Sequence, residues 1–112
     1  MAQKRDFYRI PYPVSERPRL VVGTVELEVL DISERGARVA LASETAFSGD
    51  GHFAATVRFK DGTTVQTTGI VHRREGEELV LGFSEGLPYS VIASEQQRLF
   101  RLFGREALQP KN

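Results

Sequence analysis

The stretch TVELEVLDISERG, residues 24–36, decides the fold class of this chain. Within it Val25, Leu27 and Val29 alternate with polar residues. Alternation at every second position is typical of a β-strand with one buried face, because successive strand side chains point to opposite sides. Gly36, which can adopt a positive backbone angle, ends the stretch in a tight turn. The stretch therefore predicts a half-buried strand that runs into a turn and a returning strand.

The β pattern begins at Leu20 and continues well beyond this stretch. After the first strand, the sequence predicts strands over residues 37–41, 52–59, 63–73 and 78–83. The dipeptide Asp61-Gly62 separates two alternating segments and is a strong hairpin signal. Residues 42–51 and the run Glu75-Gly76-Glu77 are expected to form a loop and a turn. Several short, evenly spaced strands favour a small antiparallel barrel.

The C-terminal segment changes to a helical period. Its apolar residues form one wide stripe: Val91, Ile92, Leu99, Phe100, Leu102 and Phe103. We expect Phe100 and Phe103 to pack in the core, and the pattern Ser94-x-x-Gln97 to form a capping box inside the helix or at its start. Gly104 suits the position after the last turn. The predicted helix would cover an open end or an edge of the barrel.

The N-terminal segment differs from the rest in charge and in its prolines. Three prolines lie between residues 11 and 18, which argues against a long helix or a central strand. Basic residues outnumber acidic ones there: Lys4, Arg5, Arg9, Arg17 and Arg19 against Asp6 and Glu16. We therefore expect a flexible basic arm over residues 1–19, a barrel with its helix over 20–104, and a tail over 105–112.

Composition narrows the class of protein. The 112 residues suit a single domain, and 15 basic residues balance 15 acidic ones, so non-specific binding to DNA is not favoured. Cysteine is absent, which excludes disulfides and thiolate metal sites, and two histidines alone do not make a zinc site. No run of about 18 apolar residues predicts a transmembrane helix, and no apolar signal segment begins the chain. We expect a cytoplasmic protein without a metal or cofactor.

Two short motifs carry the chemistry. Arg5 and Arg9 form an R-x-x-x-R pattern, and Asp31, Ser33 and Gly36 form a D-x-S-x-x-G pattern about twenty residues later. Arginines present planar forks that suit phosphate and the edge of guanine. Asp and Ser two positions apart on a strand point to the same side. Each motif alone is a weak signal, but their order and spacing in a β context predict one anion-binding and base-reading site.

With these two motifs and this β context, the chain resembles a PilZ domain, the bacterial receptor module for the second messenger cyclic di-GMP. The resemblance extends over nearly the whole chain, through Asp61-Gly62, the strands at Gly69-Ile70-Val71 and Leu81-Gly82-Phe83, and the terminal helix. It implies a mostly β protein with a small antiparallel six-stranded, split β-barrel of the PilZ type, a C-terminal α-helix and a flexible basic N-terminal arm.

The resemblance also implies the ligand and its site. Arg5 and Arg9 would hold phosphate or stack on a guanine, and Asp31 would accept hydrogen bonds from the guanine N1–H and N2–H₂ groups. Ser33 would add a hydroxyl contact, and Gly36 would allow close approach of the backbone. Two further residues are candidates by position: Lys4 as a second charge for a phosphate, and Arg73 from a neighbouring strand.

The function implied is that of a stand-alone bacterial cyclic di-GMP receptor and adaptor. Ligand would fold the arm onto the barrel and change a surface read by an unidentified effector protein, with the chain a monomer or a ligand-dependent dimer. The alternative is a PilZ-like interaction module that binds no nucleotide. An enzyme is disfavoured because no catalytic triad or phosphate-cradling loop occurs. An oligonucleotide-binding barrel is disfavoured because Phe7-Tyr8 is its only aromatic pair beside basic residues. The sequence does not select among motility, exopolysaccharide, secretion and virulence circuits.

Overall fold

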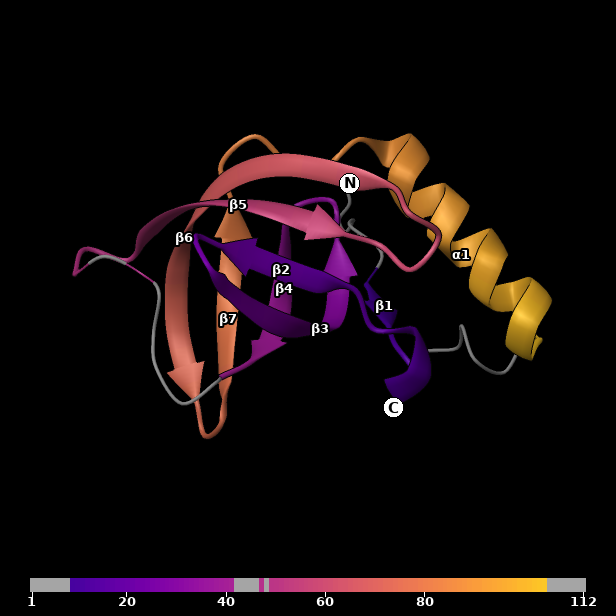
Figure 1. Ribbon diagram of the computed structural model, residues 1–112, viewed down its shortest axis with the longest axis horizontal. Helices are drawn as coiled ribbons and strands as arrows, with labels where there is room; N and C mark the ends of the chain where they lie inside the picture. The colour runs from indigo at the N-terminus through magenta and orange to yellow at the C-terminus, as the bar shows by residue number, and fades with distance from the viewer. Residues whose placement is uncertain (1–8, 42–46, 48, 105–112) are drawn as a thin grey trace, which may run out of the picture.

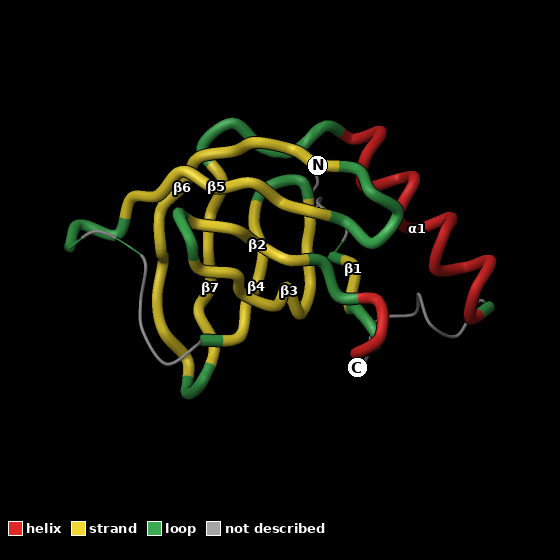
Figure 2. Tube along the Cα trace, in the orientation of Figure 1, coloured by secondary structure: helices red, strands yellow, loops and turns green. Residues whose placement is uncertain are grey.

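The computed structural model describes residues 9–41, 47 and 49–104. Strands account for half of this part of the chain, and one long α-helix lies beside them (Figure 2). In chain order the elements are β1 (Ile10–Pro11), the short 3₁₀ helix η1 (Val14–Glu16), β2 (Arg19–Val22), β3 (Val25–Ser33), β4 (Gly36–Ala40), β5 (His52–Arg58), β6 (Thr64–Glu75), β7 (Glu78–Phe83) and α1 (Tyr89–Phe103).

Six of the strands close into an antiparallel barrel. The order is β3-β2-β5-β6-β7-β4, and β4 pairs back onto β3 (Figure 1). The seventh strand, β1, pairs with Asp31 and Ile32 of β3, beyond the residues that β2 occupies. The predicted six-stranded barrel with a C-terminal helix is confirmed. The barrel matters for function because it fixes neighbouring strands in one register.

The core fills the inside of this barrel. Side chains that are at most 2% exposed come from several elements of the fold: Ile10, Leu20, Leu27, Val29, Ile32, Val39, Val57, Leu81, Ile92 and Leu99. The alternation predicted from residues 25, 27 and 29 is seen in β3, where Leu27 and Val29 point inward. Removing such apolar side chains from water is the main driving force for folding.

A β-bulge at Leu30 interrupts this alternation. The pairing of β3 with β4 shifts between Val29 and Asp31, so that Ile32 takes the next inward position. A bulge adds one residue to one strand and reverses the faces that follow it. Without it, Asp31 would lie on the inward side with Val29. The bulge therefore places Asp31 on the outer face of the barrel.

Helix α1 packs on the barrel with a narrower apolar stripe than the sequence predicts. Ile92, Glu95 and Leu99 face the barrel at 0–2% exposure, whereas Phe100 and Phe103 are 46% and 45% exposed. Each residue turns a helix by about 100°, so Phe100 points away from the face that Leu99 occupies. The prediction that Phe100 and Phe103 pack in the core is wrong. Over the part of the chain that the structure describes, no helix is long and apolar enough to cross a membrane.

The sequence predicts how α1 ends but not how it begins. The helix begins at Tyr89 after Pro88, without a side-chain capping bond, so the Ser94-x-x-Gln97 pattern lies inside it and caps nothing. At the other end Gly104 adopts a positive φ of 81°, and its N–H donates to the Phe100 carbonyl at 2.7 Å. The role predicted for Gly104 is therefore confirmed.

The second half of the predicted arm packs against the barrel and the helix. Ile10 is fully buried, and the Tyr12 hydroxyl donates to Glu95 Oε1 at 2.6 Å. Arg98 joins the same Glu95 carboxylate at 3.0 Å and Glu16 at 2.6 Å. Burial and then the neighbouring Glu95 carboxylate raise the pKa of Tyr12. This network ties residues 10–16 to α1, while residues 1–8 lie outside the described residues.

Candidate ligand-binding site

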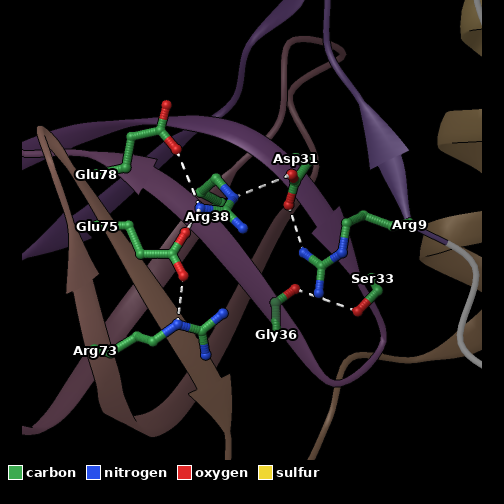
Figure 3. A network of polar contacts seen from close by, with 8 residues as sticks. All are labelled: Arg9, Asp31, Ser33, Gly36, Arg38, Arg73, Glu75 and Glu78. Carbon is green, nitrogen blue, oxygen red and sulfur yellow. Dashed lines mark hydrogen bonds and ion pairs between the residues drawn. The ribbon is translucent and has the colours of Figure 1, made fainter. Parts of the chain in front are cut away.

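The candidate site is a row of side chains on the outer face of the barrel. Strand register places Asp31 of β3 opposite Arg38 of β4, Arg38 opposite Val80 of β7, and Val80 opposite Arg73 of β6. A second register shift, between Val71 and Arg73, sets the position of Arg73 in this row. Four strands thus bring residues that are far apart in sequence onto one surface (Figure 3). We call Asp31, Arg38, Val80 and Arg73 the outer row.

Asp31 receives two guanidinium groups. Arg9 Nη1 donates to Asp31 Oδ1 at 2.5 Å, and Arg38 Nε lies 3.7 Å from Asp31 Oδ2. The two arginines reach the carboxylate from different sides (Figure 3). The Asp31 side chain is 17% exposed and that of Arg9 is 49% exposed. The structure therefore joins one residue of each motif, while Lys4 and Arg5 lie outside the described residues.

Ser33 is engaged inside the β3–β4 turn. It is 3% exposed, its hydroxyl donates to the Gly36 carbonyl at 3.4 Å, and the same oxygen accepts from the Arg35 N–H at 3.3 Å. Bonds of this kind are typical of serine in a turn. They stabilise the turn between β3 and β4, close to Asp31. The predicted ligand contact of Ser33 stays a prediction.

Gly36 serves a different purpose from the one expected. It has no positive φ, so the prediction of a positive backbone angle there is wrong. Gly36 instead pairs with Gly82 of β7, and a Cβ atom on it would lie 2.3 Å from the Leu81 carbonyl oxygen. The third position of the motif is therefore a glycine because two strands approach closely, and only a residue without a side chain fits between them.

The β6–β7 hairpin contributes a cluster of charges next to the outer row. Arg38 Nη1 lies 2.7 Å from Glu75 Oε1 and 3.2 Å from Glu78 Oε1, and Arg73 Nε donates to Glu75 Oε2 at 2.5 Å. The hydrogen bonds from Arg38 and then Arg73 lower the pKa of Glu75. Arg73 thus reaches Asp31 only through Glu75 and Arg38, not by direct contact.

Sequence reasoning missed Arg38, Glu75, Glu78 and His72 as members of this surface. Arg38 lies two residues after the motif glycine, which is the signal that could have placed it on the same face of the returning strand. From the sequence alone, the charged residues of the β6–β7 turn are typical of an ordinary solvent-exposed hairpin tip. His72 lies over Gly82, because a Cβ there would come within 2.3 Å of the His72 Nε2 atom.

The described charged side chains of the site are partly exposed, from 17% for Asp31 to 57% for Arg73. A hollow of about 430 Å³ lies elsewhere, over β2, β5 and β6, and is lined by Val21, Gly23, Ala54, Ala55, Thr56, Gln66, Thr67, Thr68 and Glu85. That hollow shares no residue with the outer row and carries no arginine. We favour the outer row as the binding surface because it holds paired cations and a carboxylate. Within residues 9–41, 47 and 49–104, no three His, Asp or Glu side chains gather as a metal ion requires.

Comparison with known proteins identifies the family. The family model described as "PilZ domain" matches residues 3–103. The comparison with curated proteins gave no match. Among solved structures, the chain is similar to the Bacillus subtilis inhibitor of motility MotI/DgrA, with a TM-score of 0.62 and 18% sequence identity. The likeness covers 93% of this chain but only 54% of that one, so the chain spans about half the length of this neighbour, and at this identity the likeness shows the fold. Because the family model covers nearly all of the sequence, the chain belongs to the PilZ domain family.

Proposed function

We propose that this chain is a cyclic di-GMP receptor that acts as an adaptor, with the outer row and the N-terminal motif as its binding surface. PilZ domains are receptor and adaptor modules rather than enzymes. The observation that carries the proposal is the contact between Arg9 and Asp31, which come from the two motifs and meet on one face of the barrel. The proposed ligand-binding residues are Arg5, Arg9, Asp31, Ser33 and Gly36, with Lys4 and Arg73 as additional candidates.

Asp31 is suited to read guanine. A carboxylate only accepts hydrogen bonds, and each of its oxygens offers two lone pairs. The guanine N1–H and N2–H₂ groups are adjacent donors that match the two oxygens. Adenine presents an acceptor at N1, so the same carboxylate disfavours it. Asp31 keeps lone pairs available beside its contacts with Arg9 and Arg38, since within the described part of the chain each oxygen has one arginine partner.

Arg9 is suited to change partners. Its side chain is 49% exposed, and its ion pair with Asp31 lies at the protein surface. Such pairs contribute at most about 1 kcal/mol. A charge-assisted hydrogen bond to a phosphate contributes about 1.5–3 kcal/mol. Ligand therefore draws Arg9 from Asp31 to a phosphate, with Arg5 and Lys4 supplying further positive charge from residues 1–8.

The same segment offers a route from ligand to partner. Ile10 follows Arg9 directly, Tyr12 lies three residues after Arg9, and the Tyr12 hydroxyl contacts Glu95 of α1. Helix α1 carries large exposed apolar side chains: Tyr89, Phe100, Leu102 and Phe103. Exposed apolar patches are typical of protein-binding surfaces. In this proposal, the arm binds the ligand through Arg9, three residues before the buried contact between Tyr12 and α1. A change in the arm can therefore reach α1, the helix to which a partner protein binds.

A second candidate is a PilZ-like interaction module that binds no nucleotide. The charge balance around the outer row favours it. Three cations, Arg9, Arg38 and Arg73, face three carboxylates, Asp31, Glu75 and Glu78, so the described part of the site has no excess positive charge for two phosphates. The two candidates differ in whether residues 1–8 and the exchange of Arg9 supply that charge.

The experiment is an isothermal titration of the purified chain with cyclic di-GMP, with cyclic di-AMP and GTP as controls. We expect saturable binding that is selective for cyclic di-GMP. Asp31→Asn should remove the preference over cyclic di-AMP, because an amide group replaces one acceptor oxygen with a donor. The matched control is Asp61→Asn, which makes the same chemical change at the β5–β6 hairpin. A folded wild-type chain that binds no cyclic di-GMP would leave the interaction module as the function.

A further inference from the structure

The two arginines at Asp31 differ in how firmly they are held. Among the residues that the structure describes, Arg9 has one carboxylate partner, Asp31, and its side chain is 49% exposed. Arg38 has three carboxylate partners, at 3.7 Å, 2.7 Å and 3.2 Å, and is 29% exposed. These partners come from β3, β6 and β7, on either side of the strand that carries Arg38. Arg38 is therefore the fixed cation at this site, and Arg9 is the exchangeable one.

The position of Arg38 is set by the closed barrel. It lies in the middle of β4, paired with Asp31 on one side and with Val80 on the other. Its partner Glu75 is itself held by Arg73 through the second carboxylate oxygen. A continuous chain of ion pairs therefore runs from Asp31 through Arg38 and Glu75 to Arg73 (Figure 3). Planar guanidinium groups suit such chains because each presents several donors in a fixed geometry.

We propose that Arg38 is a positioning residue for guanine recognition, which keeps the Asp31 carboxylate in its reading orientation after Arg9 has moved to a phosphate. The inference rests on the proposed function and deepens it. The role is distinct from that of the motif residues, because Arg38 acts on the ligand through Asp31. The simpler interpretation is that Arg38 only ties the β6–β7 hairpin to β4, and the two interpretations differ in what happens to Asp31.

The size of the effect follows from rotamer counting. An aspartate side chain has three staggered χ1 positions. If Arg38 is lost and Arg9 is on the phosphate, Asp31 has no remaining cation among its described partners and distributes over these positions. When only one of three orientations is competent, the apparent dissociation constant rises about threefold. Loss of the Arg38 charge weakens both dinucleotides alike, so it cancels in the ratio of cyclic di-GMP to cyclic di-AMP affinity.

The first test needs no ligand. Three-bond NMR couplings report the χ1 distribution of Asp31. Arg9 still contacts Asp31 in the ligand-free chain, so Arg38→Met and Arg38→Lys are each made in an Arg9→Met background. The matched control is Arg9→Met/Arg58→Met, which removes an ion pair with Glu26 elsewhere on the barrel. We expect one dominant rotamer in the wild type, in Arg9→Met and in the control, because Arg38 still contacts Asp31 in all three. Arg9→Met/Arg38→Met should show rotamer averaging, with Arg9→Met/Arg38→Lys intermediate and serving as the informative variant if the former does not fold. A single rotamer retained in Arg9→Met/Arg38→Met, or in Arg9→Met/Arg38→Lys if only that variant folds, or averaging in Arg9→Met alone, would overturn the inference.

The second test uses the ligand. Titration of Arg38→Met, or of Arg38→Lys in its place, should show about a threefold fall in the preference for cyclic di-GMP over cyclic di-AMP. The preference should be unchanged in the control Arg58→Met, which removes an ion pair with Glu26 elsewhere on the barrel. If Arg38→Met and the wild type prefer cyclic di-GMP over cyclic di-AMP to the same degree, Arg38 serves only to tie the β6–β7 hairpin to β4. If the wild-type chain binds neither dinucleotide, yet the single Asp31 rotamer of Arg9→Met is lost in Arg9→Met/Arg38→Met, the proposed function is refuted while the positioning of Asp31 by Arg38 remains.

Discussion

Replacing the motif glycine with alanine, Gly36→Ala, separates a structural role from a ligand-binding one. The added Cβ would lie 2.3 Å from the Leu81 carbonyl oxygen and 3.4 Å from the Leu81 carbonyl carbon. Real Cβ contacts essentially never fall below 3.0 Å, so the strands must separate by roughly 0.7 Å at this point. The opposing atoms belong to the backbone of β7, which cannot rotate away as a side chain can.

The expected cost is large for a single methyl group. Overpacking of a well-packed interior costs about 1–3 kcal/mol, and a clash with strand backbone belongs at the upper end. For a domain of this size each kcal/mol lowers the melting temperature by roughly 4–8 °C. At about 2–3 kcal/mol, we therefore expect Gly36→Ala to melt roughly 8–24 °C below the wild type.

Thermal unfolding followed by far-ultraviolet circular dichroism measures this effect. Gly49→Ala is the matched control, because nothing lies within 4 Å of the added Cβ and its backbone has no positive φ. It should melt within about 2 °C of the wild type, as surface substitutions usually do. If Gly36→Ala also melts within about 2 °C of the wild type, the close-approach argument is refuted. Loss of cyclic di-GMP binding at unchanged stability would then assign Gly36 a direct ligand contact.

Three further predictions concern the arm and the charges around the site. Arg9→Ala should weaken cyclic di-GMP binding by about tenfold to a hundredfold in calorimetry, because a charge-assisted contact contributes about 1.5–3 kcal/mol. Its melting temperature should fall by only a few degrees, because the lost ion pair is exposed. Tyr12→Phe should unfold more readily in urea at neutral pH by about 1–3 kcal/mol, having lost its bond to Glu95. Because the pKa of Tyr12 is raised on folding, the wild type should lose stability as the pH rises above about 10, where the unfolded tyrosine ionises. This loss should be smaller in Tyr12→Phe. Equal slopes of stability against pH in the two proteins would count against this role of Tyr12. Glu75→Gln should bind cyclic di-GMP more tightly and with a steeper salt dependence, because Arg73 and Arg38 lose an opposing charge; weaker binding in a salt titration would show that Glu75 supports the ligand instead.

Much of the barrel could be predicted from local patterns. The alternation around Leu27, the hairpin at Asp61-Gly62 and the ending at Gly104 each report a local physical preference, and the structure agrees with them. The bulge at Leu30 could not be predicted, because it depends on how β3 pairs with β4 rather than on β3 alone. The exposure of Phe100 was missed for a similar reason, since the width of a helix stripe says nothing about how much of it the barrel covers.

The site was predicted in part. The motif residues Arg9 and Asp31 do meet, although one precedes β1 and the other lies near the end of β3. Arg38 was missed because its importance comes from carboxylates that are distant in sequence, Glu75 and Glu78, which only the closed register of β4, β6 and β7 brings together. Patterns along the chain report neighbours along the chain, whereas this network is built across strands.

Binding of cyclic di-GMP to the outer row can be followed by an NMR titration of the backbone amides with this ligand. We expect saturable shifts centred on Asp31, Arg38 and Arg73, extending through Tyr12 into α1, and no comparable shifts with cyclic di-AMP. Absence of saturable shifts, or shifts centred on Thr56 in the hollow over β2, β5 and β6, would contradict binding at the outer row.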